Sequence, residues 1–274
     1  MNTVLLQTTY FGPIQWYQKL YRYDHVLIEQ YDSYQKQTFR NRCVIATANG
    51  LQALTVPVEH PSPLTSNKSP IPLGGAGGGL LVKDLRISDH NQWRRIHWNA
   101  LQSAYSESPF FEYYADDIRP FFEQKYDFLI DFNEAIRQKM CELIDIHPHV
   151  EYTQTFLPPT PPTPLTNLPS LREGTGVGFP TPPSNLPSLR EGSGVGFPTP
   201  PSNLPSLREG TGVGFPTPNP LDLRSVISAK HPLPDTDFES KPYWQVFQQK
   251  HGFQPNLSIL DLLFNQGPES IFYL

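Results

Sequence analysis

The chain has 274 residues, a formal net charge of −5 and 31 prolines. This mild acidity argues against a general nucleic-acid binder, because phosphate contacts need a surplus of Lys and Arg. No apolar stretch approaches the ~20 residues that cross a bilayer, and the first residues show no signal-peptide pattern. The two cysteines, Cys43 and Cys141, have no metal or redox spacing. Together these features predict a cytoplasmic protein with reduced thiols and no membrane span.

The first 60 residues predict a small α/β unit. Residues 3–8 form a short apolar run that favours a strand, and Gly12-Pro13 indicates a helix with Gly12 as N-cap and Pro13 as its first residue. The segment HVLIEQ from His25 predicts a second strand, so that strand, helix and strand form a βαβ unit with a parallel pair. Two more strands flank Asn49-Gly50, a strong hairpin signal. These pieces predict a mixed sheet.

Beyond residue 80 the pattern becomes helical. Apolar residues from Trp93 to Ala104 follow helical spacing, with Ser88 or Asp89 placed to cap the helix. The other expected helices run from Ser108-Pro109 to a break near Pro120, from Phe128 to Leu143, over Tyr243–Lys250, and from Ser258 to Gly267-Pro268. The predicted architecture is a small α/β layer followed by a helical part.

Two segments interrupt this pattern. From Asn167 the chain repeats NLPSLREGTGVGFPTPPS in three nearly identical copies with a period of 18 residues. Its prolines, its glycines and its few apolar side chains cannot offset the entropy of ordering, so residues 157–220 are expected to be a disordered insert. Its proline-rich start also fits a ligand of a proline-recognising partner. Residues 61–79 are expected to be a flexible loop, and residues 1–156 with 221–274 a single domain of about 210 residues.

Three groups of residues are candidates for chemistry. Gln7–Gly12 lead from the first strand to a helix N-terminus, whose N–H groups suit an anion. Ligands of open α/β sheets bind beyond the carboxyl ends of the strands. The alternative is an ordinary strand-to-helix turn.

The second group is a basic stripe. If residues 36–42 are extended, Lys36, Thr38, Arg40 and Arg42 all lie on one face. Three cations in a row need an anionic counterpart, and phosphate or carboxylate suits arginine through its bidentate fork. The alternative is a solvated basic edge strand that prevents aggregation.

The third group contains histidines. His90 and His97 are seven residues apart and share a helix face, on which His97 lies within the apolar stripe. His97 is either a neutral histidine hydrogen-bonded in the core or a general base that points into a cleft. No third ligand has a suitable spacing, so no metal site is predicted. The sequence indicates no particular cofactor.

An ordered series of motifs runs through the parts outside the two interruptions. Its members are QTTYFGPIQWY from Gln7, RNR from Arg40, LTVPV from Leu54, RIS from Arg86, HWN from His97, SPFFEYY from Ser108 and LSILDLLFN from Leu257. This series resembles the WbqC-like protein family over residues 3 to about 148 and about 221 to 267. The chain departs from the family pattern at Thr8 and Gly12, where many members have proline.

The resemblance implies work on sugar nucleotides or modified sugars, since the family is associated with O-antigen and surface-polysaccharide genes. The expected function is an enzyme of surface-polysaccharide biosynthesis, such as a transferase acting on a sugar nucleotide or an activated acyl donor, that binds a phosphate-bearing small molecule. The alternative is a non-catalytic binding or scaffold protein. The candidate residues are Lys36, Arg40 and Arg42 for the phosphates, Gln7, Tyr10, Asn41 and Asn99 for orienting the ligand, and His97 for proton transfer.

Overall fold

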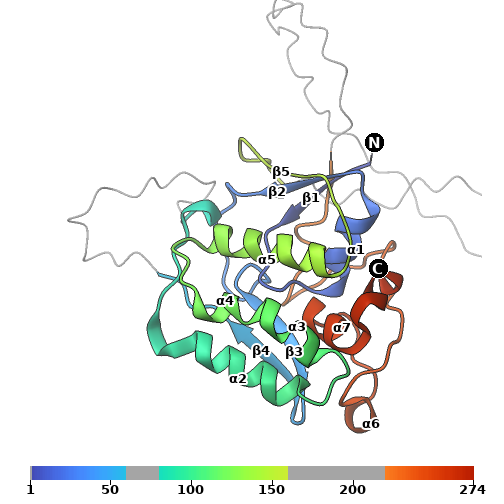
Figure 1. Cartoon of the computed structure of the whole chain (residues 1–274). Coiled ribbons are helices and arrows are strands. Elements are labelled where there is room, and N and C mark those ends of the chain that lie inside the picture. The colour runs from blue at the N-terminus through green and yellow to red at the C-terminus, as the bar shows by residue number, and fades with distance from the viewer. Residues whose placement is uncertain (1, 60–79, 160–219) are drawn as a thin grey trace, which may run out of the picture. The chain divides into compact units, whose positions relative to one another are not determined.

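The computed structural model describes residues 2–59, 80–159 and 220–274 (Figure 1). Helices, a parallel sheet and an antiparallel hairpin make up this part of the chain, which confirms the α/β class. The predicted loop at 61–79 lies outside the described residues, and so does all of the predicted insert except its first three residues and its last. None of the helices that the structure describes is long and apolar enough to cross a lipid bilayer.

Four parallel strands form the first sheet, in the order β5-β2-β1-β6. Strands β1 (Thr3–Gln7) and β2 (His25–Glu29) pair in parallel and are joined by helix α1 (Ile14–Arg22), which confirms the predicted βαβ unit. Strand β5 (Val150–Tyr152) extends the sheet beside β2, and β6 (Leu221–Asp222) extends it beside β1. The sheet therefore joins segments from both sides of residues 160–219.

The predicted hairpin is present but stands apart from this sheet. Strands β3 (Arg42–Thr47) and β4 (Gly50–Thr55) pair antiparallel, and Gly50 takes the positive φ of 103° that the tight turn requires. The sequence predicts one mixed sheet, whereas the structure divides the strands between two sheets. The reason is that β3 packs against helices α2 (Trp93–Tyr105) and α7 (Ile259–Gln266).

The remaining helices follow the predicted order. They are α3 (Phe111–Ile118), α4 (Pro120–Glu123), α5 (Leu129–Leu143) and α6 (Gln248–His251), with 3-10 turns at Val82–Asp84, His90–Gln92 and Gly267–Tyr273. The prediction that Ser88 or Asp89 caps α2 is wrong, because Asn91 and Gln92 have positive φ angles and separate that 3-10 turn from the helix. Helix α6 is a single turn, shorter than predicted.

The N-terminus of α1 is capped by a segment from the other end of the chain. Pro13, not Gly12, is the N-cap residue. The Ile14 N–H donates to the Leu257 carbonyl at 3.0 Å, and the Gln15 N–H donates to Oδ1 of Asn256 at 2.9 Å. These residues satisfy first-turn donors that a helix normally leaves to solvent or to a ligand.

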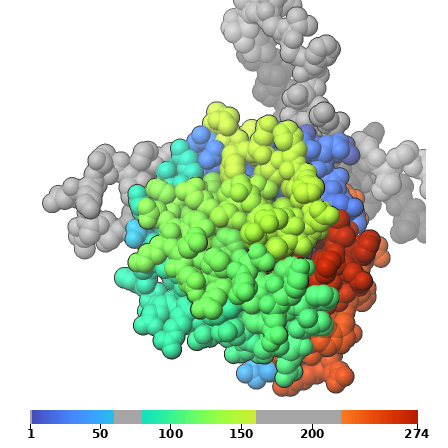
Figure 2. Space-filling model, in the orientation of Figure 1, coloured from blue at the N-terminus to red at the C-terminus, as the bar shows by residue number. Residues whose placement is uncertain are grey.

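One aromatic-rich core joins the sheet to the helices. Tyr10 and Phe11 from the connection between β1 and α1, and Trp16 of α1, are at most 2% exposed. They belong to the same buried cluster as Phe132 of α5 and Phe264 of α7. Helix α5 lies along β1, β2 and β5 in Figure 1, and the side chain of Tyr152 in β5 donates to Glu134 of α5 at 2.7 Å. Figure 2 shows the face on which the green residues of α3 to α5 form a continuous surface beside the red and orange C-terminal residues.

Candidate functional site

Polar side chains gather where the parallel strands end. Gln7 is the last residue of β1, Glu29 is the last of β2, Thr153 follows β5, and Asp222 ends β6. In open α/β sheets the carboxyl ends of the strands are the usual place for a ligand. This edge is therefore the candidate functional site of the fold.

Glu29 is the centre of this edge. Its carboxylate is 1% exposed and accepts hydrogen bonds from the Tyr31 N–H at 2.8 Å, the Thr153 hydroxyl at 3.0 Å and the Leu157 N–H at 2.9 Å. A buried carboxylate needs such partners, because burial without them costs several kcal/mol. Glu29 thus holds the end of β2, the end of β5 and the start of the following segment together.

Arg224 connects Glu29 to the last strand. Its guanidinium donates twice to Asp222, from Nε at 2.9 Å and Nη2 at 2.7 Å, and its Nη1 lies 3.5 Å from Oε2 of Glu29. Burial alone would lower the pKa of Arg224, but the hydrogen bonds and charge of Asp222 outweigh it and raise that pKa. The two-pronged pairing fixes the plane of the guanidinium at the sheet edge.

Arg40 lies in the same electrostatic environment. Its Nη2 donates to Oδ2 of Asp32 at 2.5 Å, and the two side chains are 4% and 21% exposed. Burial lowers the pKa of Arg40, the charge of Asp32 opposes this, and Arg224 lowers it further. The Nε of Arg40 is buried without a hydrogen-bond partner among the described residues.

These residues define the carboxyl-edge cluster: Glu29, Asp32, Arg40, Asp222 and Arg224. It contains three carboxylates and two guanidiniums, and Asp32 is the more exposed member of its pair with Arg40. Of the five residues, only Arg40 is among the candidates from the sequence. The others were missed because no motif or spacing marks them, and only the folded sheet brings them together.

The basic stripe does not form as predicted. Residues 36–41 make turns, not an extended strand, and Gln37 has a positive φ of 61°. Lys36 is therefore exposed on the turn, Arg40 is buried in the cluster, and Arg42 is half-buried at the start of β3. The prediction of one shared face is wrong because the chain reverses here to enter the hairpin.

Two of the orienting candidates are held by backbone groups. The side-chain amide of Gln7 donates to the Ile227 carbonyl at 2.6 Å, and that of Asn41 donates to the Val56 carbonyl at 2.8 Å. Both side chains are buried, so they fix the positions of the loops beside the cluster. Asn99 is exposed on α2, two residues beyond His97, and so points away from the core-facing side of that helix.

The structure brings Tyr10 and His97 together in the core. The Tyr10 hydroxyl lies 2.9 Å from Nδ1 of His97, and the ring of Trp93 meets the His97 ring edge-on at 5.1 Å. Burial raises the pKa of Tyr10 well above its usual value. Burial also lowers the pKa of His97 to about 4, against an opposing hydrogen bond with the Thr55 backbone. The tyrosine is therefore the donor and the neutral imidazole the acceptor at pH 7.

A second buried carboxylate lies at the start of α7. Asp261 is 1% exposed and accepts hydrogen bonds from Tyr105 at 2.8 Å, Tyr243 at 2.6 Å and Gln245 at 3.0 Å. Burial raises its pKa, although these donors oppose the change. The sequence places Asp261 at the position of a helix-capping acid, but its carboxylate instead joins α7 to α2 and to the segment before α6.

Comparison with known proteins gives one family and one distant relative. A family model described as the WbqC-like protein family matches residues 7–161 and 233–273. The uncharacterized protein Rv1507c of Mycobacterium tuberculosis is 28% identical over 126 residues, which are 45% of this chain and 47% of that protein. The chain thus spans about half the length of the curated relative it matches. No solved structure matches the chain.

Proposed function

Because the chain belongs to the WbqC-like protein family, we propose that it is an enzyme of surface-polysaccharide biosynthesis that binds a phosphate-bearing substrate such as a sugar nucleotide. The proposed binding site is the carboxyl-edge cluster. The strand-to-helix turn after β1 is a poorer place for the phosphate, because Asn256 and Leu257 already accept hydrogen bonds from the first turn of α1.

The observation that carries this proposal is the position of Arg40. Its guanidinium is buried at the carboxyl edge of the parallel sheet, donates from one nitrogen to Asp32, and has a buried Nε without a partner among the described residues. Arginine offers five N–H donors in a plane that matches a phosphate. A phosphate that displaces Asp32 would take over the Nη2 donor of Arg40 and could also accept from Nε, which has no partner among the described residues.

The other candidates take supporting roles. Lys36 is exposed on the adjoining turn and is free to approach a bound phosphate, and Arg42 adds a third cation two residues after Arg40. Gln7 and Asn41 hold the neighbouring loops through their backbone contacts. Tyr10 orients His97, and Asn99 contributes only if the ligand extends over the exposed side of α2.

His97 remains the proposed proton-transfer residue, and its surroundings define the rival hypothesis. A neutral imidazole at pH 7 is a competent base, but its Nδ1 already accepts from Tyr10 and its side chain is 4% exposed. This burial favours a non-catalytic binding or scaffold protein of the same pathway as the second candidate. The two hypotheses share the phosphate site and differ only in turnover.

Thermal unfolding of the full chain tests the binding site. Sugar nucleotides, nucleoside diphosphates and pyrophosphate are added singly, and a ligand at 100 times its dissociation constant adds about 2.7 kcal/mol of stability. We expect a ligand-induced rise in Tm for the unaltered protein that is largely lost in Arg40→Lys. That substitution retains the positive charge beside Asp32 but removes the planar fork.

The matched control is Arg119→Lys, because Arg119 also pairs with a carboxylate, Glu123 at 2.6 Å, but both side chains are more than half exposed. Its ligand-induced shift should equal that of the unaltered protein. An equal shift in Arg40→Lys for every phosphate ligand would show the assignment to be wrong. If the protein turns over a donor–acceptor pair and His97→Gln abolishes turnover while retaining the ligand-induced shift, the scaffold hypothesis fails.

A further inference from the structure

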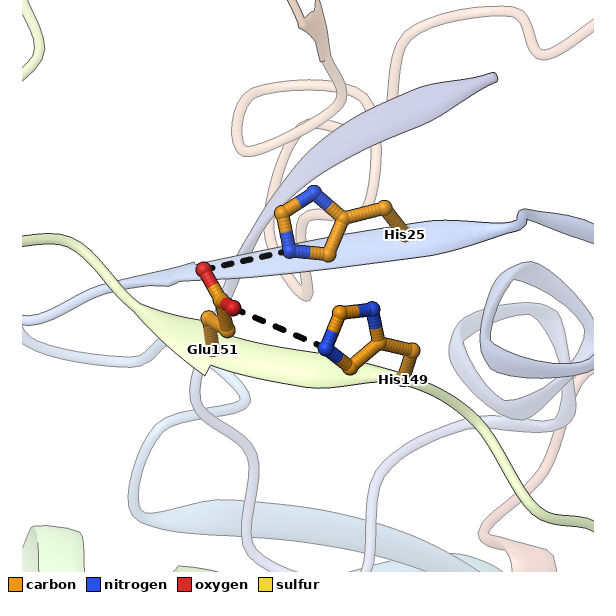
Figure 3. A group of neighbouring side chains, drawn as sticks. All are labelled: His25, His149 and Glu151. Carbon is orange, nitrogen blue, oxygen red and sulfur yellow. Dashed lines mark ion pairs between the residues drawn. The ribbon is translucent and has the colours of Figure 1, made fainter. Parts of the chain in front are cut away.

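A group of potential metal ligands lies at the other end of the same sheet. His25 begins β2, His149 is the residue before the edge strand β5, and Glu151 lies within β5. Because Val26 pairs with Val150, the preceding residues His25 and His149 are neighbours across the two strands. Figure 3 shows both imidazole rings beside the carboxylate of Glu151. His25 lies far from His149 and Glu151 in the sequence, so the spacing of residues along the chain does not reveal this group.

Strand geometry places all three side chains on one face. Side chains alternate along a strand, so His149 and Glu151 point to the same side of β5. On β2 the neighbouring Val26 is buried in the core, which leaves His25 on the opposite, half-exposed face. The three side chains are 22%, 68% and 56% exposed for His25, His149 and Glu151. An ion from solvent can therefore reach the group from the side of His149 and Glu151.

The distances fit one small ion. Nε2 of His25 is 3.3 Å from Oε2 of Glu151, and Nε2 of His149 is 3.5 Å from Oε1. The three ligand atoms all lie within 4.8 Å of one another. A tetrahedral zinc ion with bonds of 2.0–2.2 Å places adjacent ligand atoms about 3.3–3.6 Å apart. Binding one ion would require the two imidazole rings, whose centroids are 4.7 Å apart, to rotate until their nitrogens reach such a separation.

The ring nitrogen of His25, unpaired within the described part of the chain, also favours a bound metal ion. Nε2 of His25 is buried and has no hydrogen-bond partner among the described residues, although Glu151 lies within ion-pairing distance. This ring nitrogen therefore lies near the carboxylate of Glu151 but forms no hydrogen bond with it. A metal ion between them would accept the nitrogen lone pair and bind the carboxylate oxygen at once.

We propose that His25, His149 and Glu151 bind one divalent first-row transition-metal ion of the zinc type. Two imidazoles and one carboxylate supply three ligands, and the exposed side of the group leaves a fourth position for water. The ion ties edge strand β5 to β2 from the face opposite the core. This site is independent of the carboxyl-edge cluster and of the function proposed for it.

Zinc titration of the purified full chain, prepared without a polyhistidine tag and freed of metal, tests this proposal. Competition with a chromophoric chelator should show one zinc ion per chain at micromolar affinity. We expect His149→Ala and Glu151→Gln each to weaken binding by at least about tenfold, since each removes one of three protein ligands. His149 is largely exposed, so its substitution leaves the fold intact.

The matched control is His147→Ala, because His147 lies two residues from His149 and its side chain is 85% exposed. Its affinity for zinc should equal that of the unaltered protein. Cobalt gives a second readout, since a tetrahedral complex absorbs visible light far more strongly than an octahedral one. The proposal is overturned if the unaltered chain binds no zinc at micromolar concentration, or if His149→Ala and Glu151→Gln bind it as the unaltered chain does.

Discussion

The imidazole of His97 is surrounded by aromatic rings and shares its Nδ1 with the Tyr10 hydroxyl. Burial lowers its pKa to about 4, whereas a histidine in the unfolded chain titrates near 6.5. Between these values the unfolded state binds a proton that the folded state does not. His97 therefore makes the protein less stable as the pH falls from about 6.5 to 4.

Comparison with His97→Gln measures this effect. Glutamine cannot titrate, so urea unfolding should show the unaltered protein losing about 3 kcal/mol more than the variant between pH 7 and pH 4. Other titrating groups affect both proteins alike and cancel in the difference. Parallel pH curves for the two proteins would mean that His97 is accessible and titrates normally.

The effect of Asp261 on stability changes with pH in the opposite direction to that of His97. Burial raises its pKa above the usual value, so the folded state binds a proton more readily than the unfolded state does. The stability that Asp261 contributes should therefore increase as the pH falls towards the ordinary aspartate pKa near 4. Relative to Asp261→Asn, the unaltered protein should become more stable from pH 7 to pH 4 in chemical unfolding. A constant difference across that range would contradict the raised pKa.

The sequence predicts the surroundings of a single residue well when the pattern around it allows only a few placements. His97 was expected either in the core or in a cleft, and the structure places it in the core. Glu29 and Arg224 were missed because a charged residue in a sequence gives no sign of burial. Their pairing depends on β6 reaching β1 after the segment at 160–219, which local patterns do not encode.

At the scale of elements, the first turn of α1 depends on residues from beyond α6. Asn256 accepts from the Gln15 N–H and has a positive φ of 54°. Asn256→Gly keeps that backbone conformation and removes the cap, so it should cost about 1 kcal/mol. Asn256→Ala also strains the backbone and should cost about 1 kcal/mol more. Urea unfolding of both variants measures the two terms, and equal losses would show that φ carries no strain.

The elements that the sequence predicted well are those formed by neighbouring residues. The β3–β4 hairpin follows from Asn49-Gly50 between apolar runs, and α5 follows from its long helical spacing. Strands β5 and β6 were not predicted because they have three and two residues and exist only through distant partners. The shared face of residues 36–42 was expected only if that segment is extended, and its alternating cations give no sign of the turns at 36–41.

At the scale of the whole molecule, the segments before and after residues 160–219 are joined by hydrogen bonds and strand pairing. Arg224 reaches Glu29, β6 pairs with β1, and Leu257 accepts from the first turn of α1. We propose that residues 1–156 with 221–274 form a single domain. Replacing residues 160–218 by a short Gly-Ser linker should then leave Tm within a few degrees of the unaltered value, because loop-closure entropy changes slowly with length.

Calorimetry of that shortened chain measures its Tm and the breadth of its unfolding transition. A broad or strongly lowered transition would show that the removed residues stabilise the fold. The same protein also tests the alternative that the proline-rich segment recognises a partner. A partner captured by the full chain and lost only on this deletion would support that alternative.

The cap that Asn256 and Leu257 provide to α1 has a consequence for how the protein is made. The ribosome releases the chain from its N-terminus, so β1, α1 and β2 emerge long before the residues that complete the first turn of that helix. The first-turn donors of α1 can therefore bond only to water until residues 256 and 257 have been synthesised, and the cap is completed after that.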